Sequence, residues 1–461
     1  MITSQELLHL ASMSDDSTSS PQLERKLGPV MLWGLGVGYV ISGMYFGWNL
    51  GLEQGGTLGL AIATGFIIIM YLAFTFSYTE MACAIPKAGG AFDYGMKALG
   101  KDWGFLAGMA QNIEFIFAPP AIALAIGAYL NLFLPSIPVL SIAVAFYFVF
   151  TALNIYGIQA AATFELFITV LAVLGLVLFF FSAAPEFEMA NLSRNALPNG
   201  WSGVFAAIPF AIWFFLAIEG VANVAEETIN PQKNILIGFG SAIFTLVVLC
   251  ILTFTFSIGV NGWETVVFDT NNNPSDSPLP LALSNKLGTE HIMFKLVGMI
   301  GLFGLIASFH GIILVAGRAS YEFGRVKFGP AALGKINPKF KTPANALLVN
   351  MGIGIVALFT GKTGEIITVA CFGALSLYII SMVSVIQLRR KFPEMERPFK
   401  VPFYPGTPIV ALIIASIAFV AVSIYNPILA VIYFSILIFT YIWFKLTNRS
   451  RAHGDKGTTD D

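Results

Sequence analysis

Residues Gly34–Asn49 form the stretch GLGVGYVISGMYFGWN, which holds five glycines and one serine within a sixteen-residue apolar segment. Lipid offers no hydrogen-bond partners, so an unwound backbone persists at membrane depth only where it is buried in protein or lines a cavity. Broken helices of this kind present free N–H and C=O groups to a substrate or a coupling ion near the bilayer midplane. A glycine-rich helix packed closely against its neighbours is the alternative interpretation.

The composition surrounding this stretch is that of a membrane protein. Hydrophobic residues make up 56% of the 461 residues and charged residues only 11%, with a mean hydropathy of +0.78. A soluble protein carries about 25% charged residues. Apolar stretches of about 20 residues are long enough to cross the hydrocarbon core, and we count twelve: 30–51, 58–79, 103–130, 139–155, 162–183, 203–225, 235–260, 293–317, 344–360, 364–388, 407–424 and 427–446. The chain is therefore predicted to be an all-α polytopic membrane protein.

The basic residues predict the orientation of these spans. If both termini are cytoplasmic, 21 of the 25 Lys and Arg residues lie in inner segments, and the outer four are Arg194, Lys286, Lys295 and Lys362. This asymmetry satisfies the positive-inside rule for a multi-pass protein of the cytoplasmic membrane. Residues 1–27 are expected to be a disordered cytoplasmic tail, and residues 447–461 a second cytoplasmic tail. The outer segment 261–292 contains DTNNNPSDSP and is expected to be a loose surface loop, with a lid as the alternative.

The sequence offers no chemistry typical of an enzyme. We find no Walker loop, no His-Glu-x-x-His and no nucleophile elbow, and the three cysteines Cys83, Cys250 and Cys371 are too far apart to indicate a disulfide framework or a metal site. No cofactor is expected. A receptor would usually bring a soluble signalling domain, and a channel would need a continuous polar pore. Neither feature is visible in these mostly apolar spans and short tails.

The sixth predicted span is also interrupted. Residues 203–225, GVFAAIPFAIWFFLAIEGVANVA, contain Pro209, Glu219 and Gly220, which an uninterrupted lipid-facing helix would lack. Five helices separate the start of this span from the start of the first, so the two occupy matching places in two halves of opposite orientation. Two interrupted segments at matching positions are the best indication in a sequence of a transporter binding site.

Three motifs on the predicted inner face resemble signatures of the amino acid–polyamine–organocation transporter superfamily. They are EMACAIPKAGGAFDYGMKALG (Glu80–Gly100), AEETINPQKN (Ala225–Asn234) and ERPFKVPFYPGTP (Glu396–Pro408). The resemblance covers roughly residues 25–446. It implies a LeuT-type fold of twelve transmembrane helices, with a 5+5 inverted repeat in residues 28–185 and 200–390 and two added helices in 404–446. Within the superfamily, WGLGVGYVISGMYFGWNLGL resembles the first span of the ethanolamine permease branch.

The resemblance implies where a substrate would bind. The unwound part of the first span corresponds to Ile41, Ser42, Gly43 and Met44. The N–H groups that open its second half lie at the positive end of a helix dipole, where amino-acid carriers bind a carboxylate. Ethanolamine has only a hydroxyl group, which accepts the same N–H bonds more weakly.

The matching break in the sixth span is also implied by the resemblance. It corresponds to Leu216, Ala217 and Ile218, an apolar set that is less suited to a large polar side chain. Trp213 aligns with an aromatic residue that covers the substrate in relatives, and an indole face attracts an ammonium group by about 0.5–2 kcal/mol. The alternative for Trp213 is an interfacial anchor.

Glu114 lies near the middle of the third span, about eleven residues from Trp103. A carboxylate at that depth should face the protein interior and have a partner. In relatives this part of the span lines the far end of the pocket, so Glu114 would bind a small ammonium group or accept a proton. A structural pair with Gln111, Asn112 or His310 is the alternative. Glu219 is expected to be a structural or gating acid, because this position carries Glu throughout the family.

The coupling ion is left open between a proton and sodium. His310 is the only histidine inside a span, and its charge changes near neutral pH, so it could relay a proton with Glu114. A neutral histidine bonded to a backbone carbonyl is the alternative. Some proton-coupled relatives carry a lysine in the fifth span, where this sequence has Ala172.

Together these features predict a secondary active transporter and not an enzyme. We expect it to import a small amine, with ethanolamine as the first candidate, by alternating access. Proton symport is the expected energy source. An amino-acid or polyamine permease of the same superfamily is the alternative.

Overall fold

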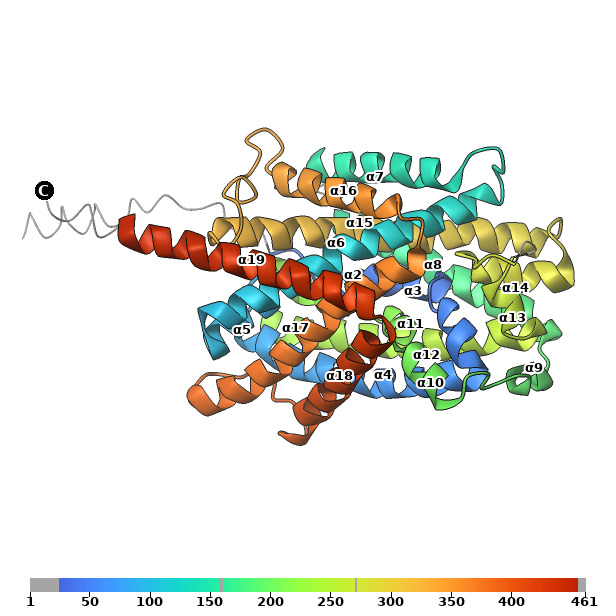
Figure 1. Cartoon of the computed structure of the whole chain (residues 1–461), viewed down its shortest axis with the longest axis horizontal. Helices are drawn as coiled ribbons and strands as arrows, with labels where there is room; N and C mark the ends of the chain where they lie inside the picture. The colour runs from blue at the N-terminus through green and yellow to red at the C-terminus, as the bar shows by residue number, and fades with distance from the viewer. Residues whose placement is uncertain (1–24, 157–160, 270–271, 455–461) are drawn as a thin grey trace, which may run out of the picture.

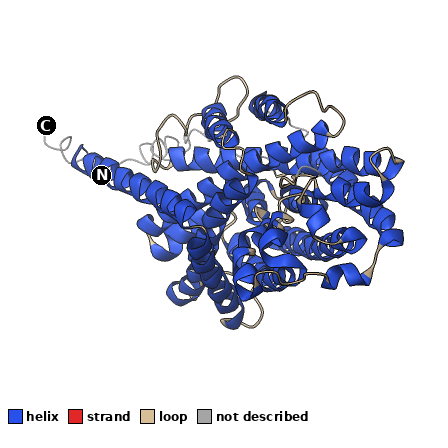
Figure 2. Cartoon of the chain, turned by 45° about the vertical axis from the view of Figure 1, so that its right-hand side comes forward, coloured by secondary structure: helices blue, strands red, loops and turns tan. Residues whose placement is uncertain are grey.

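The computed structural model describes residues 25–156, 161–269 and 272–454, and within these ranges every regular element is a helix (Figure 2). Of the predicted tails, residues 1–24 and 455–461 lie outside the described part, whereas residues 447–454 continue the last helix, α19 (Pro427–Gly454). Two isolated β-bridges complete the secondary structure of the described ranges. The predicted all-α class is confirmed.

Each of the twelve predicted spans corresponds to apolar helix in the structure (Figure 1). The long helices are α4 (Leu50–Ala84), which is kinked at Gly56, and α6 (Lys101–Asn131), α7 (Val139–Tyr156), α8 (Ala161–Ala183), α12 (Pro231–Asn261), α15 (Ile292–Arg325), α17 (Thr363–Lys391), α18 (Gly406–Tyr425) and α19 (Pro427–Gly454). The sixth span comprises α10 (Gly200–Ala206), α11 (Ile208–Trp213) and η2 (Ile218–Glu227), while the first comprises α2 (Pro29–Val40) and α3 (Ser42–Tyr45). The ninth is α16 (Ala344–Leu358).

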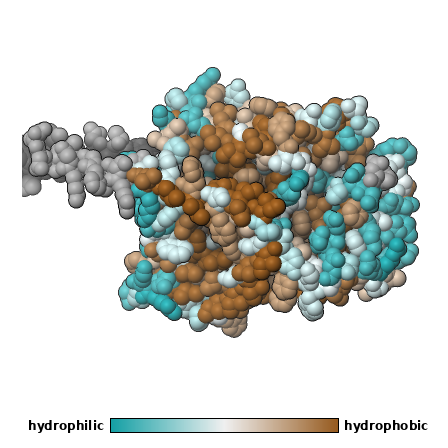
Figure 3. All heavy atoms as spheres, viewed as in Figure 1, coloured by the Kyte–Doolittle hydropathy of each residue, from teal (hydrophilic) through white to brown (hydrophobic). Residues whose placement is uncertain are grey.

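The helices divide into a buried centre and an apolar outer wall. The segment Ile208–Glu227, α6 and α17 are mostly enclosed by protein, whereas α7, α18 and α19 turn much of their surface outward. Large apolar side chains such as Ile428 and Phe439 are exposed on α19. In Figure 3 such hydrophobic residues occupy the middle of the visible face, between hydrophilic ends. This distribution is that of a protein whose outer wall faces lipid.

The inner-face motifs meet around one buried acid, Glu80, at the end of α4. Arg389 of α17 donates to both of its carboxylate oxygens at 2.8 and 2.6 Å, and the Val401 amide donates at 2.7 Å. Arg397 lies 3.4 Å from the same carboxylate. The first and third motifs are thereby joined. Since breaking a buried ion pair by removing one partner costs about 3–5 kcal/mol, Glu80 holds this side of the protein together.

The first and second motifs are also in contact. The Ala88 amide donates to Glu226, and Asn223 returns a hydrogen bond of 2.9 Å to the Ala88 carbonyl oxygen. The second half of the first motif forms a short helix, α5 (Ala91–Leu99), directly before α6. The three motifs thus act as one packed assembly rather than as three separate loops.

The outer segment between α12 and α15 is folded, so the expectation of a loose surface loop is wrong for its described residues. It contains α13 (Glu264–Val267) and α14 (Pro278–Leu287). Asn49 donates to the carbonyl oxygens of Val266 and Ser275, and Thr363 donates to Asp276 at 2.7 Å. Burial raises the pKa of Asp276 to about 6, an effect that the hydrogen bond from Thr363 only partly offsets. Three further short helices on this side are η1 (Ala184–Glu186), α9 (Met189–Ser193) and α10.

Candidate functional site

The first span is interrupted where the sequence predicts, but the interruption is shallower. α2 ends at Val40 and α3 begins at Ser42, while Ile41 keeps right-handed helical angles. The amide of Ser42 donates to the hydroxyl of Ser308 on α15 at 2.9 Å, and that hydroxyl donates to the Gly38 carbonyl oxygen at 2.6 Å. A side chain from another helix therefore replaces one bond of the helical ladder.

The predicted four-residue unwound stretch is wrong in extent, because Ser42, Gly43 and Met44 belong to the short helix α3. The backbone becomes irregular only afterwards, where Phe46 is extended and Gly47 has a φ of +85°. A Cβ atom at Gly43 or Gly47 would overlap Trp213. These glycines therefore fit both the broken-helix and the close-packing interpretation of the first span. They allow its backbone to turn, and they let the two interrupted spans touch.

The second interrupted span breaks at the predicted residues. α11 ends at Trp213, a turn follows, and η2 begins at Ile218. Ala217 has a φ of +75°, a left-handed conformation that costs a residue other than glycine about 1–3 kcal/mol. Its amide donates to Glu114 Oε1 at 3.1 Å. The break is thereby joined to the third span.

Glu114 lies in the buried centre of α6, as predicted, but its partner differs from those expected. Its nearest charged neighbour is the carboxyl group of Glu219 in η2, which lies beside it in the buried centre. Asn112 instead contacts Ser320, and His310 contacts a different acid. Because two adjacent buried carboxylates repel each other strongly, we expect this pair to hold one proton between them.

The acid pair continues into a tyrosine network that the sequence did not reveal. Tyr378 of α17 donates to Glu219 Oε2 at 3.2 Å, and its hydroxyl lies 3.0 Å from that of Tyr71 on α4. Both rings are fully buried. Tyrosine inside a span, away from the interfacial position typical of this residue, was the signal available in the sequence. Glu114 Oε2 and Glu219 Oε1 have no hydrogen-bond partner among the described residues.

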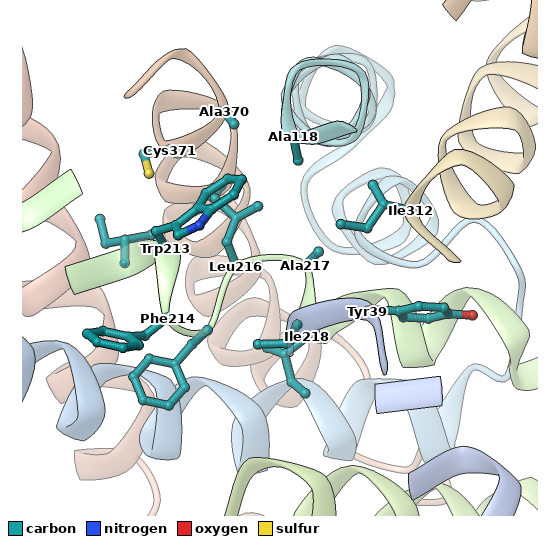
Figure 4. Packing of buried hydrophobic residues seen from close by; sticks show 14 of the residues in the cluster. Tyr39, Ala118, Trp213, Phe214, Leu216, Ala217, Ile218, Ile312, Ala370 and Cys371 are labelled. Atoms are coloured by element: carbon teal, nitrogen blue, oxygen red, sulfur yellow. The ribbon is translucent and has the colours of Figure 1, made fainter. Parts of the chain in front are cut away.

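Trp213 belongs to the buried centre, so the interfacial alternative is wrong for this residue. Its side chain is 3% exposed, and its indole N–H donates to the Phe46 carbonyl oxygen at 3.1 Å. In Figure 4 its ring lies beside Leu216 and Ala217, with Ala118 and Ile312 across from the turn. All of these side chains are buried. The acids are thus enclosed by apolar groups, as the sequence of the second break predicts.

His310 contacts Glu165 rather than Glu114. Its Nδ1 atom lies 3.1 Å from Glu165 Oε2 on α8, and both side chains are almost completely buried. The expected relay between His310 and Glu114 is therefore wrong, as is the alternative of a backbone partner. Glu165 was missed by the sequence analysis, although an acid within the predicted span 162–183 was a visible signal. Ala172, the residue at the lysine position of some relatives, uses its carbonyl oxygen to accept a bond from Tyr45.

These contacts define what the site can do chemically. Two irregular backbone segments and a pair of carboxyl groups meet in a buried, apolar centre, which suits the binding of a small polar or cationic molecule. Within the described ranges, no group of three His, Cys, Asp or Glu residues could hold a metal ion. The arrangement contains two separate acid clusters, Glu114 with Glu219 and Glu165 with His310.

The similarity of this chain to known proteins covers almost all of its helical part. Residues 27–445 match the family described as amino acid permease. The chain is similar to an uncharacterized transporter of Rhizobium meliloti, at 27% identity over 89% of this chain and 90% of that protein. It is also similar to a branched-chain amino acid permease of Bacillus subtilis, at 26% identity over 86% and 88% of the two chains. A methylthioribose transporter of Bacillus subtilis is 25% identical over 86% and 87%.

Proposed function

The chain belongs to the amino acid permease family, and we propose that it imports a small amine, with ethanolamine as the best candidate, by alternating access. Membership makes it a multi-pass membrane transporter of amino acid-type substrates and not an enzyme. The finer assignment of substrate rests on the residues of the buried centre. The cytoplasmic membrane and cytoplasmic termini, predicted from the basic residues, are part of the same proposal.

The observation that carries this proposal is the acid pair at the second break. Glu114 and Glu219 are adjacent buried carboxyl groups, and a pair of this kind that holds one proton carries one net negative charge. Glu114 Oε2 and Glu219 Oε1 accept no bond from any other described group, so the proton of the pair lies at these oxygens and an ammonium donor would bind there in its place. A buried negative charge favours a cation and opposes a second carboxylate. This favours an amine that lacks a carboxylate.

The backbone near the first break supports the same substrate class. The Ser42 amide is already bonded to Ser308, so it is not free to bind a substrate carboxylate in this conformation. A single hydroxyl group needs fewer hydrogen-bond donors than a carboxylate does. We place the ammonium group of ethanolamine at Glu114 and its hydroxyl group toward Gly43 and Met44. Trp213 would then cover the ammonium group with its ring.

The residues 28–185 and 200–390 are proposed to form the two inverted repeats. The contact of the two interrupted spans at Gly43, Gly47 and Trp213 supports this arrangement. In such folds the substrate binds where the repeats meet, and transport moves one part against the other. The buried position of Trp213, Leu216 and Ala217 corresponds to a closed site.

An amino-acid or polyamine permease is the second candidate, favoured by the similarity to the branched-chain amino acid permease of Bacillus subtilis. Uptake of labelled ethanolamine by cells that express the protein, with excess alanine, arginine or putrescine as competitor, separates the two. We expect saturable ethanolamine uptake that unlabelled ethanolamine inhibits best. Absence of that uptake, or inhibition by one amino acid at far lower concentration, would reject ethanolamine as the substrate.

The role of Glu114 has its own test. Glu114→Gln keeps the size of the side chain and an acceptor for the Ala217 amide but removes the charge. We expect uptake to fall at least about 100-fold, because an unpaired buried charge costs about 3–5 kcal/mol. Glu188→Gln, at an outer residue whose side chain is 62% exposed, is the matched control. Normal uptake by Glu114→Gln at equal expression would exclude ammonium binding by this carboxylate.

A further inference from the structure

The second acid cluster lies apart from the proposed amine site and has no role in it. Glu165 of α8 and His310 of α15 face each other against α2, and their closest atoms are 3.1 Å apart. The rings of Phe150 and Phe164 lie on the His310 imidazole, each with its centroid 6.1 Å away. A charged or hydrogen-bonded pair is thus enclosed on one side by aromatic groups.

One oxygen of Glu165 is left without a partner. Its Oε1 atom is buried and accepts no hydrogen bond from the described residues. Space for that oxygen is provided by Gly38 and Gly311, since a Cβ atom would lie 2.7 Å from it at the first position and 3.1 Å at the second. A buried carboxylate oxygen without a hydrogen bond is unfavourable, so an additional donor is expected there.

A cavity between α2, α8, η2 and α15 leads away from this oxygen. It has a volume of about 50 Å³ and is lined by Tyr39, Glu165, Glu227, His310 and Arg318 together with apolar side chains. One water molecule needs about 10–15 Å³ of such a cavity, so the cavity has room for roughly three water molecules. The hydroxyl of Tyr39, which also has no partner, lies among these groups. The cavity is polar and large enough to be hydrated.

The cavity ends at a partly exposed ion pair. Arg318 of α15 lies 2.7 Å from Glu227 of η2, and their side chains are 26% and 22% exposed. His310 and Arg318 are eight residues apart on one helix, which corresponds to about 12 Å along its axis. Arg318 is the first basic residue of the predicted cytoplasmic segment that follows the eighth span. The chain of polar groups therefore runs from the buried pair toward the cytoplasm.

The titratable groups that face the pair come from each helix lining the cavity. They are Tyr39 from α2, Glu227 from η2 and Arg318 from α15, in addition to the pair itself. Thr169 of α8 donates to the Gly34 carbonyl oxygen nearby and does not titrate. Arg318 and Glu227 compensate each other, so Glu165 and His310 are the groups left to exchange a proton with cavity water.

We propose that Glu165 and His310 form a proton-binding site, separate from the amine site, which exchanges its proton with the cytoplasmic side through this hydrated cavity. The step moves one proton between cavity water and the Glu165–His310 pair, and no other bond changes. The inference rests on the proposed amine transport, for which it supplies the coupling ion. Glu114 and Glu219 remain the substrate-binding acids.

The pair is mechanically close to the first break. Ser308, which bridges Gly38 and Ser42, is two residues from His310 on the same helix. Gly38 contacts the Glu165 carboxylate on its other side. A change of charge on Glu165 therefore acts directly on the helix end that must move during alternating access.

Proteoliposomes with a pH difference of one unit, acid outside, and a clamped membrane potential test the proposal. We expect the wild type to accumulate labelled ethanolamine about tenfold, since one pH unit corresponds to a factor of ten for one coupled proton. Glu165→Gln and His310→Gln should accumulate none above equilibrium. Both should still exchange labelled for unlabelled ethanolamine within about twofold of the wild-type rate. His291→Gln, an exposed residue that caps the outer end of α15, is the matched control.

Three results would overturn the proposal. In the first, either variant accumulates ethanolamine as well as the wild type does, and in the second, either variant loses exchange as well as accumulation. The third is accumulation by the wild type that only a sodium gradient drives. Difference infrared spectra of the solubilised protein after a pH jump provide a readout without substrate. The wild type should show a protonated-carboxyl component that is missing from the spectrum of Glu165→Gln, present in that of His291→Gln, and separate from any band of Glu114 and Glu219. If the wild type exchanges no ethanolamine at all, the proposed function fails while this band still decides the proton site.

Discussion

Ser308 offers the sharpest test of how the first span is interrupted. Its hydroxyl accepts a bond from the Ser42 amide at 2.9 Å and donates one to the Gly38 carbonyl oxygen at 2.6 Å, and all three groups are buried. Ser308→Ala leaves both backbone groups without a partner, at about 1–3 kcal/mol each. Part of this cost is recovered because Gly38 and Ser42 have the spacing of a helical hydrogen bond.

Complete closure of that bond is opposed by packing, since Gly43 contacts the Trp213 carbonyl oxygen and Phe46 must stay extended. We therefore expect a loss of about 2–3 kcal/mol. Unfolding entropy is about 2.1 cal/mol/K per residue, and 461 residues give about 1 kcal/mol/K, so Tm should fall by about 2–3 °C. Hydrogen exchange of the Ser42 amide should accelerate by about 30- to 150-fold.

Buried thiols make the thermal measurement direct, because Cys83, Cys250 and Cys371 are free and become reactive to a thiol dye on unfolding. The matched control is Ser257→Ala. Ser257 is buried but its hydroxyl has no partner, so its removal should change stability by less than about 0.5 kcal/mol. Equal melting of the two alanine variants, or unchanged exchange at Ser42, would refute the bridging role of Ser308.

Three further perturbations probe the substrate site, the inner motifs and the outer loop. Trp213→Leu should raise the KM for ethanolamine about 2- to 30-fold relative to Trp213→Phe, because only the ring attracts a cation; equal values would indicate a role for bulk alone. Glu80→Gln should cost about 3–5 kcal/mol by leaving Arg389 partly unpaired, seen as lower Tm and yield; a wild-type Tm would contradict this. Asp276 binds its proton more tightly when the loop is folded, so docking should weaken as pH rises from about 4 to about 6. A probe on Asn273→Cys should report lower anisotropy over that range, and Asp276→Asn should abolish the change.

The helical architecture and the positions of both breaks could be predicted because their signals are local. Runs of about 20 apolar residues mark spans, and glycine, proline or an acid within a span marks an interruption. Ala217 adopts its left-handed conformation within the predicted triplet. The extent of the first break could not be predicted, because the helix at Ser42 is interrupted by a hydroxyl from α15, more than 260 residues away in sequence.

The partners of the buried acids could not be predicted from the sequence either. Glu114 and Glu219 were assigned separate roles, and His310 was paired with the wrong acid, because depth in a span does not say which side of the helix faces which neighbour. Glu165 is a residue that sequence reasoning could have identified but did not. A carboxylate in a span requires a partner, and applying that rule to the fifth span would have identified it as a candidate.

The position of α2 between the two acid clusters has a consequence for coupling. Its end contacts Ser308 and Glu165 through Gly38, while α3, directly after it, contacts Trp213 through Gly43. A tilt of α2 must therefore separate Gly38 from the Glu165 carboxylate and disturb the substrate-side contacts at the same time. A ligand shifts a conformational equilibrium only by its differential affinity for the two states. The proposed proton and amine sites both meet this condition, since each touches the same movable segment from a different side.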